Sequence, residues 1–204
     1  MADMNSPRRR PPVNLLLLAV GIILAVWLVI SFRAGGYYLE RDVFACQLSG
    51  YAAIGYLALS LLAGPSIRLL SFAGLVIEKE VSAQLSRNAG IASALAAGLH
   101  TVIALITYLK ADWLVVFQIH YLQWGAAALF VLLVLLFGSF KPLLGLARWK
   151  LWKPLFRLSF LAAILTLLHI LYAPFAPRPL TIGLAVATIV ICLLRWVPER
   201  TVAR

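Results

Sequence analysis

Long apolar runs separated by short basic segments dominate the chain. A helix needs about 20 mainly apolar residues to cross a membrane, and six runs approach that length. They are residues 14–32, 48–64, 88–109, 119–140, 155–173 and 180–196. The first run follows basic residues, as a secretory signal peptide would, but exceeds the roughly 7–15 apolar residues of that class. The sequence therefore predicts an all-α fold, an integral membrane bundle of six transmembrane helices over residues 14–197, with tails at 1–13 and 198–204.

The segments between the runs predict where the helices end. Arg33 to Gln47 is expected to be a polar loop with a Gly-Gly turn signal, and the second helix to stop at Pro65. Residues 66–86 hold too many charges to span, and the apolar segment Trp113 to Gln118 is too short. The apolar part of the first segment, IRLLSFAGLVI (67–77), and the segment Trp113 to Gln118 are expected at the membrane surface. Pro174 to Pro179 is expected to be a tight non-helical connection. The sequence shows no internal repeat and no soluble domain.

Composition supports the membrane prediction. Hydrophobic residues make up 63% of the 204 residues, charged residues make up 12%, and the mean hydropathy is +0.97. A soluble domain carries about 25% charged residues. The net charge of +11 does not indicate nucleic-acid binding, because the basic residues flank apolar runs, where they set orientation. Cys46 and Cys192 show no metal-ligand spacing and are expected to be free thiols.

The distribution of basic residues predicts the orientation. Only Arg33, Arg41, Lys110 and Arg178 fall on one side of the predicted bundle, and the other fourteen of the eighteen Lys and Arg residues fall on the opposite side. Basic residues concentrate in cytoplasmic loops. Both termini are therefore predicted to be cytoplasmic.

Two histidines are predicted to lie at one depth of the membrane. His100 is thirteen residues beyond Arg87, and His169 is twelve beyond Arg157; at about 1.5 Å per residue both lie roughly 18–20 Å from the inner face. Two level imidazoles on neighbouring helices can supply the two axial nitrogens of a haem iron. Three uses remain open at this point: haem ligation, a hydrogen bond to a carbonyl, Ser or Thr (with Thr101 and Thr166 nearby), and zinc, which needs further ligands.

Three segments resemble a known family. LSGYAAIGYLALSLLAGP (48–65), RNAGIASALAAGLH (87–100) and WKPLFRLSFLAAILTLLH (152–169) are similar to the ferric reductase-like transmembrane domain. Within it they most resemble the haem-binding membrane subunit of the periplasmic methionine sulfoxide reductase system, and the resemblance covers about residues 45–195. It implies a b-type haem bundle in a bacterial inner membrane, with His100 and His169 as iron ligands.

The chain departs from that family at the inner haem. The family usually has another histidine thirteen residues before the one matching His169, where this chain has Phe156, and Phe160 replaces a common tyrosine. The matching position before His100 is Arg87. We therefore expect one haem b per chain, in the outer half of the membrane.

Outer-face residues are further candidates for cofactor contacts. His120 is expected to be a wetted interfacial histidine or a partner for a haem propionate or an outer-face quinone. Arg178 and Lys110 are alternative propionate partners, although incomplete charge asymmetry explains them as well.

The sequence predicts two alternative functions. The first is an electron-transfer subunit that is surrounded by membrane lipid. Because the sequence has no nucleotide-binding motif, this subunit would need a redox partner protein, a quinone or FMN to exchange electrons. The second is a haem-free membrane scaffold or assembly subunit. A small-solute transporter is disfavoured, because helices with broken centres are absent from the pattern.

Overall fold

The computed structural model describes residues 41–72, 79–139, 152–174, 176 and 178–194. Every regular element in this part of the chain is a helix, so the all-α prediction is confirmed there. The elements are α2 (Arg41–Phe72), α3 (Lys79–Thr107), α4 (Val115–Gln118), α5 (His120–Gly138), α7 (Trp152–Tyr172) and α8 (Arg178–Leu194). The predicted first helix, residues 14–32, and both tails lie outside the described residues.

Within the described residues, three helices are long and apolar enough to cross a membrane. The qualifying segments are Phe44–Ser66, Glu80–Thr107 and His120–Gly138, and two shorter apolar helices follow at Arg157–Tyr172 and Thr181–Leu194. Large apolar side chains are exposed along one face of α3, at Leu95, Leu99, Val102 and Ile106, and along one face of α8. Their spacing of three and four residues is that of a single helical face. Such faces suit contact with membrane lipid.

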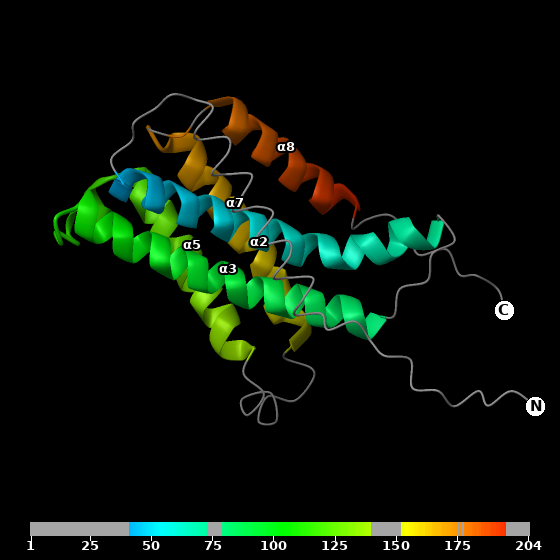
Figure 1. Cartoon of the computed structure of the whole chain (residues 1–204). Helices are drawn as coiled ribbons and strands as arrows, with labels where there is room; N and C mark the ends of the chain where they lie inside the picture. The colour runs from blue at the N-terminus through cyan, green and yellow to red at the C-terminus, as the bar shows by residue number, and fades with distance from the viewer. Residues whose placement is uncertain (1–40, 73–78, 140–151, 175, 177, 195–204) are drawn as a thin grey trace, which may run out of the picture.

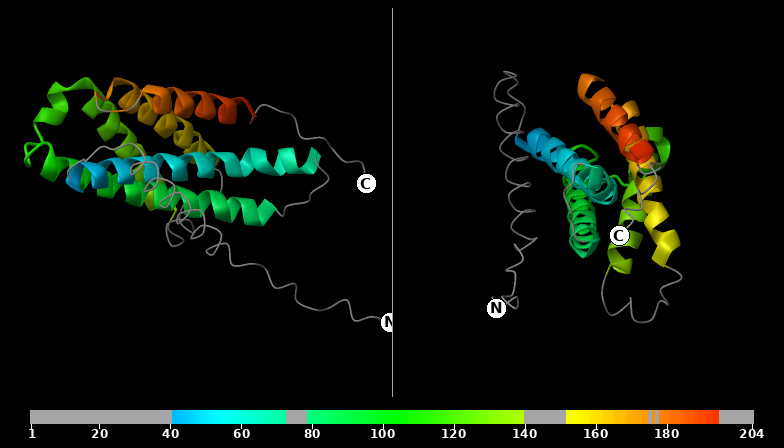
Figure 2. Two further views of the ribbon diagram at one scale, coloured as in Figure 1. Left: turned by 45° about the horizontal axis from the view of Figure 1, so that its top comes forward. Right: turned by 90° about the vertical axis from the view of Figure 1, so that its right-hand side faces the viewer.

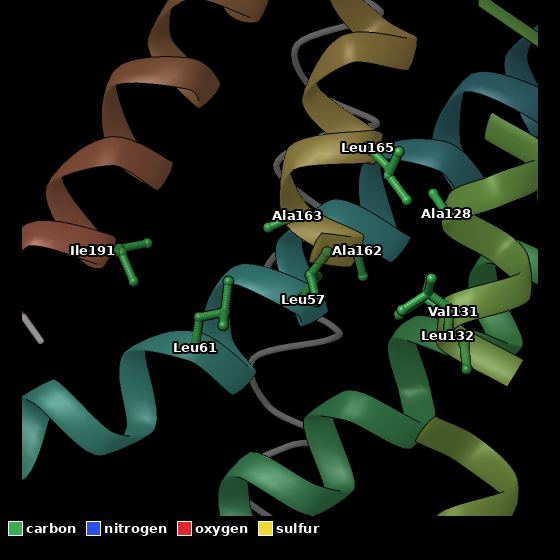
Figure 3. Packing of buried hydrophobic residues seen from close by; sticks show 10 residues of the cluster. Leu57, Leu61, Ala128, Val131, Leu132, Ala162, Ala163, Leu165 and Ile191 are labelled. Atoms are coloured by element: carbon green, nitrogen blue, oxygen red, sulfur yellow. The ribbon is translucent and has the colours of Figure 1, made fainter. Parts of the chain in front are cut away.

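The helices form two antiparallel pairs, α2 with α3 and α5 with α7, and α8 packs against α7 and α2 (Figures 1 and 2). The start of α2, the end of α3, the start of α5 and the end of α7 lie at the same end of the bundle (Figure 1). A buried apolar cluster joins the two pairs, with Leu57 and Leu61 from α2, Leu132 from α5, Ala162 from α7 and Ile191 from α8 (Figure 3).

Hydroxyl groups fix the register of α2 against α3. Ser93 donates to the carbonyl oxygen of Ala53 at 2.8 Å. Ser60 and Ser86 each donate to the other's carbonyl oxygen, at 2.9 and 2.8 Å. The donors on α3 are seven residues apart, as are the acceptors on α2, so one stripe of each helix faces the other. Small polar residues are common at such interfaces, because they allow close backbone approach and bond between helices.

The second helix does not stop at Pro65, as the sequence suggested, and this prediction is wrong. α2 begins at Arg41, inside the expected loop, and continues through Pro65 to Phe72. Proline removes one helical hydrogen bond, but neighbouring helices and Ser side chains compensate in membrane helices. The carbonyl that loses its helical partner is that of Leu61, four residues before the proline. Two hydroxyl groups bond to the carbonyls beside it: Ser66 donates to Leu62, and Ser82 of α3 donates to Ala63.

α3 begins at Lys79, nine residues before the expected start at residue 88, so the expectation that residues 79–86 precede the helix is also wrong. The remaining boundaries agree more closely with prediction. α5, α7 and α8 each begin and end within about three residues of the expected helices, although α8 already includes Pro179. Proline is tolerated in the first turn of a helix. Trp113, Leu114 and Phe117 are exposed, consistent with a surface segment. The chain turns at the end of α3 through Lys110 and Ala111, whose φ angles are 46° and 64°.

Candidate histidine site

The structure brings His100 and His169 together. Their ring centroids lie 6.2 Å apart, and the ring planes cross at 78°. His100 is on α3 and His169 is on α7, so one imidazole comes from each antiparallel pair. The two histidines that the sequence places level with each other are thus neighbours in the bundle, and their depth in a membrane stays a prediction.

A backbone carbonyl of the packing partner holds each imidazole. Nδ1 of His100 donates to the carbonyl oxygen of Cys46 on α2 at 2.8 Å. Nδ1 of His169 donates to that of Tyr121 on α5 at 2.7 Å. A carbonyl oxygen only accepts, so Nδ1 carries the proton in both neutral rings. Nε2 is then the nitrogen with the free lone pair, and the bond at Nδ1 orients the ring, as outer partners of metal-bound histidines do.

Each imidazole also lies against a glycine. A Cβ atom added to Gly50 of α2 would be 2.9 Å from Nδ1 of His100, and one added to Gly125 of α5 would be 2.7 Å from Nδ1 of His169. Only glycine leaves this space without displacing the ring or the helix. In each pair the glycine lies four residues after the accepting carbonyl, at Cys46 and Tyr121 respectively.

The two helix pairs share one arrangement, although their sequences show no repeat. In each pair the second helix supplies the histidine, and the first supplies the carbonyl and the glycine. A buried small residue lies seven positions after each accepting carbonyl and seven positions before each histidine. These residues are Ala53 and Ser93 in the first pair and Ala128 and Ala162 in the second. The sequence motifs indicated neither this repeated arrangement nor the two glycines.

The immediate surroundings of the rings are partly aromatic and sulfur-containing. The Tyr121 ring lies 5.8 Å from the His169 ring, centroid to centroid, at 36°. The Cys46 sulfur lies 3.6 Å from Nδ1 of His100. Cys46 and Cys192 are free thiols, as predicted. Thr101 and Thr166 bond to carbonyls within their own helices, so the carbonyls described above are the partners of the imidazoles.

The other predicted site residues do not join this contact. His120 is exposed at the start of α5, with Nδ1 3.4 Å from the side-chain oxygen of Gln123. Arg178 is exposed at the first residue of α8, and Lys110 is exposed in the turn after α3. These residues remain at the predicted outer end of the bundle.

Arg87, at the level predicted for an inner haem, has a structural partner. Its guanidinium donates to the carbonyl oxygen of Ser139, which caps the C-terminus of α5, while its Nε is buried and has no hydrogen-bond partner among the described residues. A cation stabilises the carbonyl end of a helix. Phe156 lies in α7, but its side chain is outside the described residues, as is any packing it makes.

The donor set at the two histidines suits a cofactor that brings its own ligands. Within the described residues, no group of three or more His, Cys, Asp or Glu side chains is placed to hold a metal ion. A porphyrin supplies four nitrogens and leaves two axial positions for the protein. Metal–nitrogen bonds of about 2.0–2.1 Å, with roughly 1 Å from each nitrogen to its ring centre, separate two axial imidazole centres by about 6 Å. The observed separation of 6.2 Å fits this arrangement.

No protein-family model matches the chain, and no curated protein sequence matches it. The resemblance to the ferric reductase-like domain therefore remains a prediction from the sequence motifs.

Proposed function

We propose that this chain is a b-type cytochrome-like membrane protein that carries electrons within the bilayer through one haem b held by His100 and His169. The observation that carries the proposal is the approach of the two rings to 6.2 Å with both Nδ1 atoms bonded to carbonyls. This leaves one free Nε2 lone pair on each side. When bound, the haem supplies one-electron chemistry at its iron.

The chain's own residues would bind, orient and shield that group. The carbonyl oxygens of Cys46 and Tyr121 select the tautomer and increase the basicity of each imidazole. The apolar residues around the two pairs exclude water, which keeps the reduction potential under the control of the ligands and the local dielectric. We propose that electrons come from a quinol or a partner reductase, with FMN as an alternative carrier, and leave to an outer-face acceptor.

The proposed setting is a bundle of six spans in a bacterial inner membrane, with both termini in the cytoplasm. Three long apolar helices and two shorter ones support a membrane location. The asymmetry of basic residues supports the orientation. The remaining span of the proposed six, first in the chain, would be residues 14–32.

A haem-free membrane scaffold is the second candidate, and one observation favours it. His100 continues the heptad series of Ser86 and Ser93 on α3, and all three side chains bond to carbonyls of α2. On this view His100 is one more polar contact that joins the two helices, and His169 has the same role between α5 and α7.

Glutamine substitutions distinguish the two candidates. In His100→Gln and His169→Gln the side-chain amide still donates to the carbonyl, but it offers iron no imidazole nitrogen. We expect both variants to lose most of their haem, a larger effect than the roughly 10–100-fold cost of losing an outer partner. His120→Gln is the matched control and should keep a wild-type reduced-minus-oxidised spectrum.

The measurement is haem content and the absorption spectrum of each purified protein at equal helix content. A colourless wild-type protein supports the scaffold. Full haem occupancy in His169→Gln would show that this histidine is not a ligand.

A further inference from the structure

Gly50 and Gly125 are in contact with the same edge of the two imidazoles. A Cβ at Gly50 would also lie 3.1 Å from Cε1 of His100, and one at Gly125 would lie 3.0 Å from Cε1 of His169. Contacts under 3.0 Å, which both Nδ1 atoms would make, are essentially never seen for real Cβ atoms. The Nδ1–Cε1 edge of each ring therefore rests directly on the backbone of the opposite helix.

Two constraints then determine the plane of each ring. The hydrogen bond from Nδ1 to the carbonyl fixes one atom of the ring. The glycine, one helical turn further along, limits rotation about that bond, because its backbone is in contact with the ring edge. The two rings are constrained independently, by α2 and by α5, and their planes cross at 78°.

We propose that Gly50 and Gly125 are positioning residues that hold the two axial imidazoles nearly perpendicular on the iron. This inference rests on the proposed haem ligation. Parallel imidazole planes donate to the same iron d orbital, whereas crossed planes donate to two different ones. The crossed arrangement brings those orbitals closer in energy and alters the electronic structure of the low-spin iron. Axial-ligand geometry is one of the means by which a protein tunes a haem.

The test uses the full-length, haem-loaded protein and low-temperature electron paramagnetic resonance of the oxidised iron. Nearly perpendicular planes predict a strongly anisotropic low-spin signal with a large maximal g value for the wild type. Gly50→Ala and Gly125→Ala should each rotate one imidazole, lower the maximal g value and shift the midpoint potential. Alanine is the better helix former, so weakened helices cannot explain these changes.

Gly98→Ala and Gly183→Ala are the matched controls, because an added Cβ at either position meets no atom within 4 Å. Gly98 lies on the same helix as His100. Both control proteins should retain the wild-type signal and potential.

The outcomes separate this inference from the proposed function. A wild-type protein that binds no haem refutes the function itself. Haem-loaded Gly50→Ala and Gly125→Ala proteins with wild-type spectra leave the function standing and overturn the role of the glycines. Loss of haem from a folded glycine variant, with haem kept by both controls, supports the inference. If neither alanine variant folds, the wild-type spectrum decides, since the rhombic signal of parallel planes contradicts the proposal.

Discussion

The reciprocal bonds between Ser60 and Ser86 predict a measurable share of the α2–α3 stability. Each hydroxyl donates to the other residue's carbonyl, at 2.9 and 2.8 Å, and the two hydroxyl oxygens are 3.3 Å apart. A serine hydroxyl has a single proton. Because both protons go to carbonyls, the contact between the hydroxyls adds no third hydrogen bond.

Ser60→Ala and Ser86→Ala should therefore be weakly destabilising and additive. Interhelical hydrogen bonds in membranes contribute about 0.6 kcal/mol on average and about 1.7 kcal/mol at most. Each carbonyl keeps its own helical partner after the substitution, which places the effect near the average. We expect about 0.6 kcal/mol for each variant and about 1.2 kcal/mol for the double variant.

The assay is unfolding in mixed micelles of increasing denaturing-detergent fraction, followed by circular dichroism. Thr101→Val is the control, because Thr101 is exposed and its hydroxyl bonds to Ala97 of the same helix; its effect should stay within about 0.5 kcal/mol. A coupling energy above about 0.5 kcal/mol between the two serines would refute the reasoning, since it would show that the hydroxyls depend on each other. All of these variants should retain the wild-type haem spectrum.

Two further predictions concern stoichiometry and orientation. A pyridine haemochrome assay against protein concentration should give one haem per chain, because Arg87 and Phe156 occupy the inner positions and neither ligates iron; two haems would contradict the single-site proposal. In a Cys46→Ala/Cys192→Ala protein, a cysteine at Ala111 should react with impermeant reagents from the outer side and one at Gln84 only from the cytoplasm. The reverse pattern would invert the proposed topology.

The sequence predicted α5, α7 and α8 well, because their ends coincide with the ends of apolar runs, whereas α2 and α3 extend into the charged segments beside their apolar runs. It was wrong at Pro65, since proline is tolerated inside membrane helices, where neighbouring helices and local adjustments satisfy the backbone. The equal depth of His100 and His169 followed from a constant rise per residue, and the 6.2 Å ring separation agrees with it.

The partners of the imidazoles were harder to predict. Every residue type has a backbone carbonyl, so the residue types at Cys46 and Tyr121 do not indicate that their carbonyls accept a hydrogen bond from an imidazole. One usable signal was present, in the heptad spacing that joins Ser86, Ser93 and His100 on one helix. That spacing places His100 on the stripe that faces α2, and a glycine on the matching stripe of α2 would then be expected to make room for the ring.

The division of the two histidines between helix pairs would link binding of the proposed haem to assembly. Neither α2 with α3 nor α5 with α7 contains both imidazoles, so a ligand that needs both can bind only after the hairpins have associated. By mass action, such a ligand increases the ratio of associated to separated helix pairs, and the increase grows with the ligand concentration divided by its dissociation constant. During biogenesis the haem would then stabilise the association of the two helix pairs. Its supply would determine what fraction of the newly inserted chain has both pairs associated.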